Sequence, residues 1–305
     1  MGEMAFKAQL YQTVMGEALE MKSDITHRRS TNNFGTIVWQ LAELWPTGGW
    51  GSLEYGTIGH TPGQVVGGRW KPLHYFYNRF LYRNQACACG RDGRCFVRND
   101  DPINGFTGSF QTSLLHIATG AVKPLGPAFA VSLGPGAAAM DWTCLGGPSQ
   151  GNPFAQNCTA WSSVVSTLDS CAASGADCVL LQQLSDASGK LVIDSWELLT
   201  TPFAMAIDAT AQITAEVTTG LHPSPPPGWG EAATVTVKSD KTAVLVELHT
   251  LAQGRFSDNA FHVPAGATVS VEFFFFGAPD LGALTSTLRV DSANTYAAGF
   301  GAAGK

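Results

Sequence analysis

Three tryptophans, Trp39, Trp45 and Trp50, stand close together at the end of an apolar run and in the glycine-rich loop that follows it. An indole face packs well against the C–H bonds on one face of a pyranose ring, because both surfaces are broad and apolar. Aromatic side chains beside a few polar groups are typical of small-ligand sites. The stretch therefore indicates a carbohydrate site, with Gln40 as a supporting polar residue.

Each of these residues also has a purely structural interpretation. Trp39 could be a plain core side chain, and Trp45 and Trp50 could either shape a pocket rim or only pack the loop. Glu43 directly follows the apolar run and is better explained as a loop anchor than as a catalyst. The histidines lack metal-ligand and catalytic-triad spacing, and no nucleophile-elbow motif supports serine chemistry. The sequence therefore predicts no metal and no cofactor.

The elements that hold the tryptophans can be predicted from their patterns. Residues 4–28 repeat apolar side chains at three- and four-residue spacing, which is typical of a helix. Residues 36–41, TIVWQL, predict a strand that is covered on both faces. A second helix is expected over residues 71–80, with Pro72 in its first turn. This order is that of the last crossover and last strand of a barrel of eight strand–helix units.

Short strands and turns dominate the rest of the chain and predict two all-β domains, with a boundary near Pro202. The expected strands are residues 96–98, 109–118, 129–133, 179–184 and 191–199 in a first set, and residues 212–218, 233–238, 243–249, 268–275 and 286–290 in a second. The tail after Ala297 is rich in glycine and alanine and is expected to be disordered.

The seven cysteines suggest disulfides. Cys89 and Cys95 face each other if Gly93 takes the left-handed position of a tight hairpin, which predicts a disulfide between them. Zinc is the alternative, but the local spacing offers no fourth ligand. The sequence leaves open how the remaining cysteines pair, namely Cys87, Cys144, Cys158, Cys171 and Cys178.

A glycosylation sequon at Asn157, together with the cysteines, predicts a secreted protein or one of the lysosomal or vacuolar lumen. The alternative is a reducing compartment, with buried thiols and a sequon that arose by chance. Residues 1–19 lack the basic-then-apolar layout of a secretory signal. A net charge of −6 without a basic patch argues against nucleic acid and anionic membranes as partners.

Four segments carry a resemblance to a known family. WQLAELWPTGGWGSLEYG and GGRWKPLHYFYNRFLY, residues 39–56 and 67–82, resemble the end of the catalytic barrel of β-mannosidases of glycoside hydrolase family 2. CFVRND and GRFSDNAF, residues 95–100 and 254–261, are similar to segments of the two β-sandwich domains that follow that barrel. The family usually reads WQLNE, whereas this chain has Ala42 in place of the asparagine, which puts the loop after the strand in doubt.

The resemblance implies the end of a (β/α)8 barrel followed by two immunoglobulin-like sandwiches. The expected domains are residues 1–83, 84–203 and 204–305. Trp39 would form the floor under a terminal mannose, and the peptide bond after it is expected to be cis. In GRFSDNAF, Arg255, Asp258 and Asn259 are expected to tie a sandwich corner by hydrogen bonds rather than to form a site.

The implied activity is a retaining exo-β-mannosidase that removes terminal non-reducing β-D-mannose from β-mannoside oligosaccharides. Retaining enzymes need two carboxylates about 5 Å apart, and no residue of this chain matches either family motif. Both are expected upstream of Met1, so the chain is expected to be an inactive fragment whose partner is the missing N-terminal part of the enzyme. The alternatives are a non-catalytic carbohydrate-binding or interaction module made of the two sandwiches, and an inert remnant.

Overall fold

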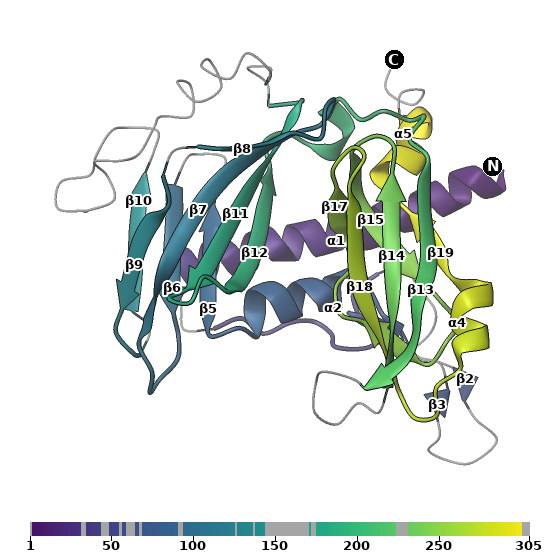
Figure 1. Cartoon of the computed structure of the whole chain (residues 1–305), viewed down its shortest axis with the longest axis horizontal. Coiled ribbons are helices and arrows are strands. Elements are labelled where there is room, and N and C mark those ends of the chain that lie inside the picture. The colour runs from purple at the N-terminus through teal and green to yellow at the C-terminus, as the bar shows by residue number, and fades with distance from the viewer. Residues whose placement is uncertain are drawn as a thin grey trace. The chain divides into compact units, whose positions relative to one another are not determined.

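Antiparallel strands make up most of the regular secondary structure in the computed structural model shown in Figure 1. The structure describes residues 2–31, 35–43, 49–54, 57–58, 65–66, 69–90, 94–125, 127–136, 138–143, 171, 175–223 and 231–300. The chain divides into two compact units. One comprises Met1–Met21, Ile37–Phe76 and Ile207–Lys305, and the other Lys22–Thr36 and Tyr77–Ala206. The domain boundaries at residues 83/84 and 203/204 stay predictions.

The two main sheets of the first unit are antiparallel, and Figure 1 shows β13, β14 and β18 of the larger one side by side. The larger sheet has the order β13 (Ile213–Pro223), β14 (Glu231–Ser239), β18 (Thr268–Phe275) and β16 (Gly254–Phe256). The smaller sheet has the order β17 (Phe261–Val263), β15 (Ala243–His249) and β19 (Arg289–Asp291). Val235, Val237 and Phe273 lie in the shared apolar core, which also takes in Leu284 of helix α4 (Leu281–Thr287). This is the sheet-on-sheet arrangement expected of a sandwich.

Strand β15 is buried along nearly its whole length, from Ala243 to Leu248. Helix α1 (Glu3–Ser30) lies against it: the Tyr11 hydroxyl donates to Leu245 O at 2.6 Å. The Tyr11 ring also packs on Tyr296 of helix α5 (Ala293–Phe300), with centroids 5.1 Å apart. One face of β15 therefore meets the sandwich core and the other meets helices, which explains why it is buried on both faces.

The prediction of a strand over residues 36–41 is wrong, because residues 35–41 are in neither a helix nor a strand. Ala42 makes a single parallel bridge to Leu53 at the start of β1 (Leu53–Glu54). A barrel strand needs hydrogen-bonding neighbours on both sides, and the described part of the chain supplies none to residues 36–40. No barrel sheet forms among the described residues.

Three further two-residue strands follow in the first unit: β2 (Thr57–Ile58), β3 (Val65–Val66) and β4 (Arg69–Trp70). β1 pairs with β4 and β2 with β3, both antiparallel. The second predicted helix is present as α2 (Pro72–Phe76), which continues as a π-helical turn, η1 (Tyr77–Leu81). The division between the two units falls inside this helix and inside α1.

The second unit is a further pair of antiparallel sheets. One has the order β10 (Ala138–Thr143), β6 (Arg94–Asn99) and β5 (Gln85–Cys89). The other has the order β12 (Leu191–Leu198), β11 (Cys178–Asp186), β7 (Phe106–His116) and β8 (Val122–Pro124), with β9 (Phe129–Leu133) also on β7. A 3-10 turn, η3 (Pro202–Ala204), follows. Phe110, Leu180 and Leu184 are fully buried between the sheets.

The predicted disulfide between Cys89 and Cys95 is confirmed, with Cα atoms 3.9 Å apart on the paired strands β5 and β6. A second disulfide joins Cys171 to Cys178, and Cys87 is a buried free thiol. Asn157, Cys144 and Cys158 lie outside the described residues.

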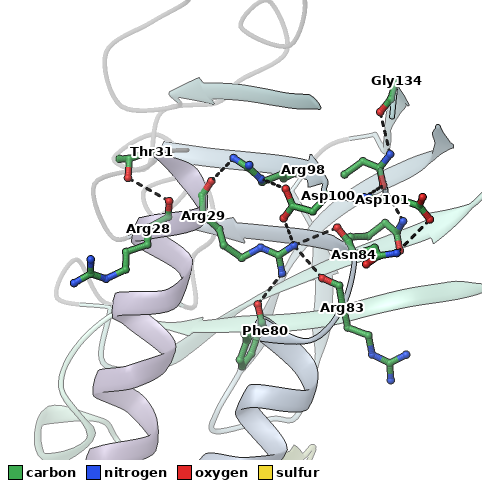
Figure 2. A network of polar contacts seen from close by, with 12 residues as sticks. Arg28, Arg29, Thr31, Phe80, Arg83, Asn84, Arg98, Asp100, Asp101 and Gly134 are labelled. Atoms are coloured by element: carbon green, nitrogen blue, oxygen red, sulfur yellow. Dashed lines mark hydrogen bonds and ion pairs between the residues drawn. The ribbon is translucent and has the colours of Figure 1, made fainter. Parts of the chain in front are cut away.

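A polar cluster in the second unit fixes the end of α1 (Figure 2). The Arg29 guanidinium donates to Phe80 O, Arg83 O and Asn84 O at 2.8, 3.0 and 3.2 Å, and to Asp100 at 2.5 Å. Arg98 completes the cluster by pairing with Asp100 and donating to Arg29 O, the carbonyl of the last helical turn. Burial lowers the pKa of Arg29, and the bond to Asp100 partly offsets that effect.

Two predictions near the C-terminus are wrong. Residues 286–287 end helix α4 instead of starting a strand, since the Asp280 side chain caps that helix by accepting from Ala283 N at 2.7 Å. The tail is helical to Phe300, because Ser292 caps α5 by accepting from Thr295 N at 3.2 Å. The other predicted strands are present within a few residues of their expected bounds. No helix among the described residues is long and apolar enough to cross a membrane.

Candidate functional site

The tryptophans of the candidate site lie in the first unit, on the segment that follows α1. Trp39 is 77% exposed and Trp50 is 67% exposed, whereas Gln40 is half-buried. The peptide bond between Trp39 and Gln40 is cis, as the resemblance implies. Trp45 lies outside the described residues. Neither described tryptophan is a core side chain, so the purely structural interpretation of Trp39 does not hold in this structure.

Backbone hydrogen bonds bring the segment after Trp39 against the residues after Trp50. Leu41 O accepts from both Ser52 N and Leu53 N at 3.0 Å, and Glu43 N donates to Leu53 O at 2.9 Å. A Cβ atom on Gly51 would lie 2.6 Å from Glu43 N, so only glycine permits this approach. The two exposed tryptophans thus lie just before two segments, residues 41–43 and 51–53, that hydrogen-bond to each other.

A buried ion pair lies beneath this turn. Lys71 Nζ donates to Glu43 Oε1 at 2.6 Å and to Gly49 O at 2.6 Å, and Gly51 N donates to the same carboxylate oxygen at 3.2 Å. Lys71 and Glu43 are each 3% exposed. Glu43 therefore acts as an anchor of the loop, which agrees with the interpretation preferred from the sequence.

A third element, helix α1, contributes Glu17 to this cluster. Its Oε2 lies 3.7 Å from Lys71 Nζ. Burial raises the pKa of Glu17, and the positive charge of Lys71 partly offsets that rise. Lys71 directly precedes the first turn of α2, where a cation is disfavoured by the helix dipole. That misplacement is a signal in the sequence from which a buried carboxylate partner for Lys71 could have been predicted.

Ser52 and His74 extend the cluster without offering acid–base chemistry. The Ser52 hydroxyl donates its hydrogen to Leu41 O at 3.0 Å. The His74 Nδ1 atom lies 2.9 Å from Ser52 Oγ, so it carries a hydrogen and donates to that hydroxyl oxygen. Burial, and then the positive charge of Arg255, lowers the pKa of His74 to about 4. His74 is therefore neutral near pH 7 and serves as a hydrogen-bond donor.

Trp70, which the sequence did not single out, packs against other side chains of the first unit. Its ring meets His74 and Tyr75 at centroid distances of 4.2 and 5.3 Å, and the Arg255 guanidinium lies 4.5 Å above it. Asn259 ties its corner as expected, because its side chain accepts from Leu248 N at 2.8 Å and donates to Leu248 O at 3.0 Å. Both observations support a structural role for the GRFSDNAF segment.

The described residues of this region hold no pair of free carboxylates. Glu43 and Glu17 face Lys71, and Glu54 pairs with Arg69 at 2.9 Å. A retaining glycosidase needs a nucleophile and a separate acid/base, whereas each of these three carboxylates faces a cation. Across the described residues there is also no group of three or more His, Cys, Asp or Glu side chains that could hold a metal.

Comparison with known proteins finds a family match within the first unit. Residues 210–296 match the Ig-fold domain of mannosidases. The β-mannosidase of Capra hircus is 37% identical over 85 residues, and that of Rattus norvegicus is 34% identical over 87 residues; each match covers 25% of this chain. The chain resembles the C-terminal part of a β-mannosidase. The matched stretch spans only 8% of each of these mannosidases.

Solved structures extend the likeness of fold to most of the chain. The β-D-mannosidase from Dictyoglomus thermophilum has a TM-score of 0.59 at 15% identity, and the match covers 92% of this chain and 29% of the mannosidase. The exo-chitosanase of Amycolatopsis orientalis has a TM-score of 0.52 at 16% identity, over 94% of this chain and 33% of that protein. At these identities the likeness shows the fold alone. The chain thus spans about a third or less of the glycosidase structures it matches.

Proposed function

We propose that this chain is part of a retaining exo-β-mannosidase, and that Trp39 supplies the apolar floor on which a terminal β-D-mannose rests. The observation that carries the proposal is that Trp39 is 77% exposed immediately before a turn that is anchored on a buried ion pair. The β-mannosidase relatives support the substrate class.

The physical argument rests on the exposure of Trp39. Leaving a large aromatic side chain in water forfeits about 1.5–3 kcal/mol that burial would provide. A sugar ring recovers part of that free energy by covering the indole. The hydrogen bonds of Leu41 and Glu43 fix the backbone just beyond Trp39, so little conformational freedom is lost when a ligand binds. Gln40, which is half-buried beside Trp39, is proposed as the supporting polar residue.

The catalytic carboxylates are proposed to come from a part of the enzyme outside this chain, since the carboxylates near Trp39 are engaged with cations. The chain alone is therefore expected not to hydrolyse a chromogenic β-mannoside. Turnover that disappears in Glu43→Ala would contradict this expectation and would assign Glu43 a catalytic role.

Nuclear magnetic resonance of the chain labelled with 15N-tryptophan tests the site itself. Methyl β-D-mannoside at millimolar concentration is expected to shift the indole resonance of Trp39, identified by its loss in Trp39→Phe. Phe203→Ala serves as a control and is expected to leave the shift of Trp39 unchanged. Phe203 is also a well-exposed aromatic residue, at 66%, but it lies in the second unit. An unperturbed Trp39 would refute the proposal. Shifts confined to Trp142 and Trp196, on the sandwich strands β10 and β12, would support the alternative of a carbohydrate-binding module.

A further inference from the structure

Trp50 has an unusual backbone conformation, with φ at +33°. Such left-handed values are disfavoured for bulky side chains, so this backbone conformation is strained. The Trp50 side chain gains little in return within the described part of the protein, because it is 67% exposed. The surroundings must therefore impose this conformation on Trp50.

The contacts of the two neighbouring glycines show what imposes it. Gly49 O accepts from Lys71 Nζ at 2.6 Å, and Gly51 N donates to Glu43 Oε1 at 3.2 Å. Gly51 N also lies 2.8 Å from Gly49 O, which closes a tight turn around Trp50. The two members of one buried ion pair thus hold the residues on either side of Trp50 and direct its side chain outward.

We propose that the Glu43–Lys71 ion pair positions Trp50 as a second stacking surface, for the sugar ring that is linked to the terminal mannose. This inference rests on the proposed function and adds a second contact to the same site. Trp50 would touch the ligand, whereas Glu43 and Lys71 act through it as positioning residues.

The cost of the arrangement supports a functional reason for it. Removing a lysine and a glutamate from water carries a desolvation penalty that their attraction often only balances. An apolar pair would avoid this penalty. It could not, however, donate a hydrogen bond to Gly49 O and accept one from Gly51 N. An aromatic side chain on a fixed backbone binds a sugar with little loss of conformational entropy, which is the property that a stacking surface needs.

The test uses the complete chain labelled with 15N-tryptophan, two probes and a matched set of variants. Trp39 is expected to respond to both methyl β-D-mannoside and β-1,4-mannobiose, whereas Trp50 responds to mannobiose only. Lys71→Met is expected to abolish the Trp50 response, and Lys71→Arg is expected to restore it partly. Lys7→Met is the control, because Lys7 forms an exposed ion pair with Glu3 in the same unit.

Each outcome decides a different claim. If Trp39 responds and Trp50 is silent towards mannobiose, the inference is overturned and the proposed function stands. If both are silent, the proposed function fails, and the inference with it. An unchanged Trp50 response in Lys71→Met would overturn the positioning role. If Lys71→Met does not fold, Glu43→Gln takes its place, because it keeps the shape of the side chain and removes its charge.

Discussion

Replacing Arg29 by alanine is expected to destabilise the second unit by about 3 kcal/mol. The Arg29 side chain is 11% exposed and gives four hydrogen bonds, one to Asp100 and three to the carbonyls of Phe80, Arg83 and Asn84 (Figure 2). Breaking a buried charge pair by removing one partner costs roughly 3–5 kcal/mol. We expect the lower end of that range, because Asp100 retains its ion pair with Arg98 and its side chain is 31% exposed.

The neighbouring arginine supplies a matched control. Among the residues that the structure describes, the Arg28 side chain pairs with Asp24, four residues earlier on the same helix, and it is 45% exposed. Such surface pairs contribute little to stability, so Arg28→Ala is expected to have almost no effect. Arg29→Lys retains the charge but cannot reach several carbonyls at once, and it is expected to lie between the two.

Native-state hydrogen exchange measures this difference within the second unit. The amide of Asp100 donates to Asn84 O at 2.7 Å and reports on the same cluster. A loss of about 3 kcal/mol corresponds to exchange that is faster by roughly a hundredfold. Equal exchange rates in Arg29→Ala and Arg28→Ala would refute the reasoning, because they would show that the buried hydrogen bonds of Arg29 contribute no more than a surface ion pair.

Two further predictions concern the turn beneath the tryptophans. His74 has a pKa lowered to about 4, so its contribution to stability is complete above its unfolded pKa of about 6.5 and is lost as the pH falls towards 4. The first unit of the wild type should therefore lose about 2–3 kcal/mol over that range relative to His74→Asn, measured by urea unfolding; parallel pH profiles would disprove this. Gly51→Ala should cost about 2–4 kcal/mol, since its Cβ would lie 2.6 Å from Glu43 N, whereas Gly49→Ala meets nothing within 4 Å. Equal unfolding midpoints for these two alanine variants would show that the close approach is not required.

Local patterns in the sequence were sufficient to predict most of the elements. The bounds of β9, β15 and β18 agree with prediction to the residue, because alternation, β-branched residues and turn residues act over a few neighbours. The disulfide between Cys89 and Cys95 follows from a hairpin only seven residues long. Helix α1 and the shorter helix that α2 and η1 form were predicted for the same reason. The caps at Asp280 and Ser292 were missed, although each is a recognisable local signal.

Long-range contacts decided what the sequence could not. Residues 36–41 have every local preference for a strand, yet a strand exists only where neighbours supply hydrogen bonds, and the described chain supplies none to residues 36–40. The ion pair of Glu43 and Lys71 joins residues 28 positions apart, and Glu17 reaches it from another helix. The left-handed backbone of Trp50 depends on that pair, so no pattern around Trp50 could reveal it. Side-chain charges separated along the chain meet only after the backbone has folded, and their meeting is what turns an apolar loop into a candidate binding surface.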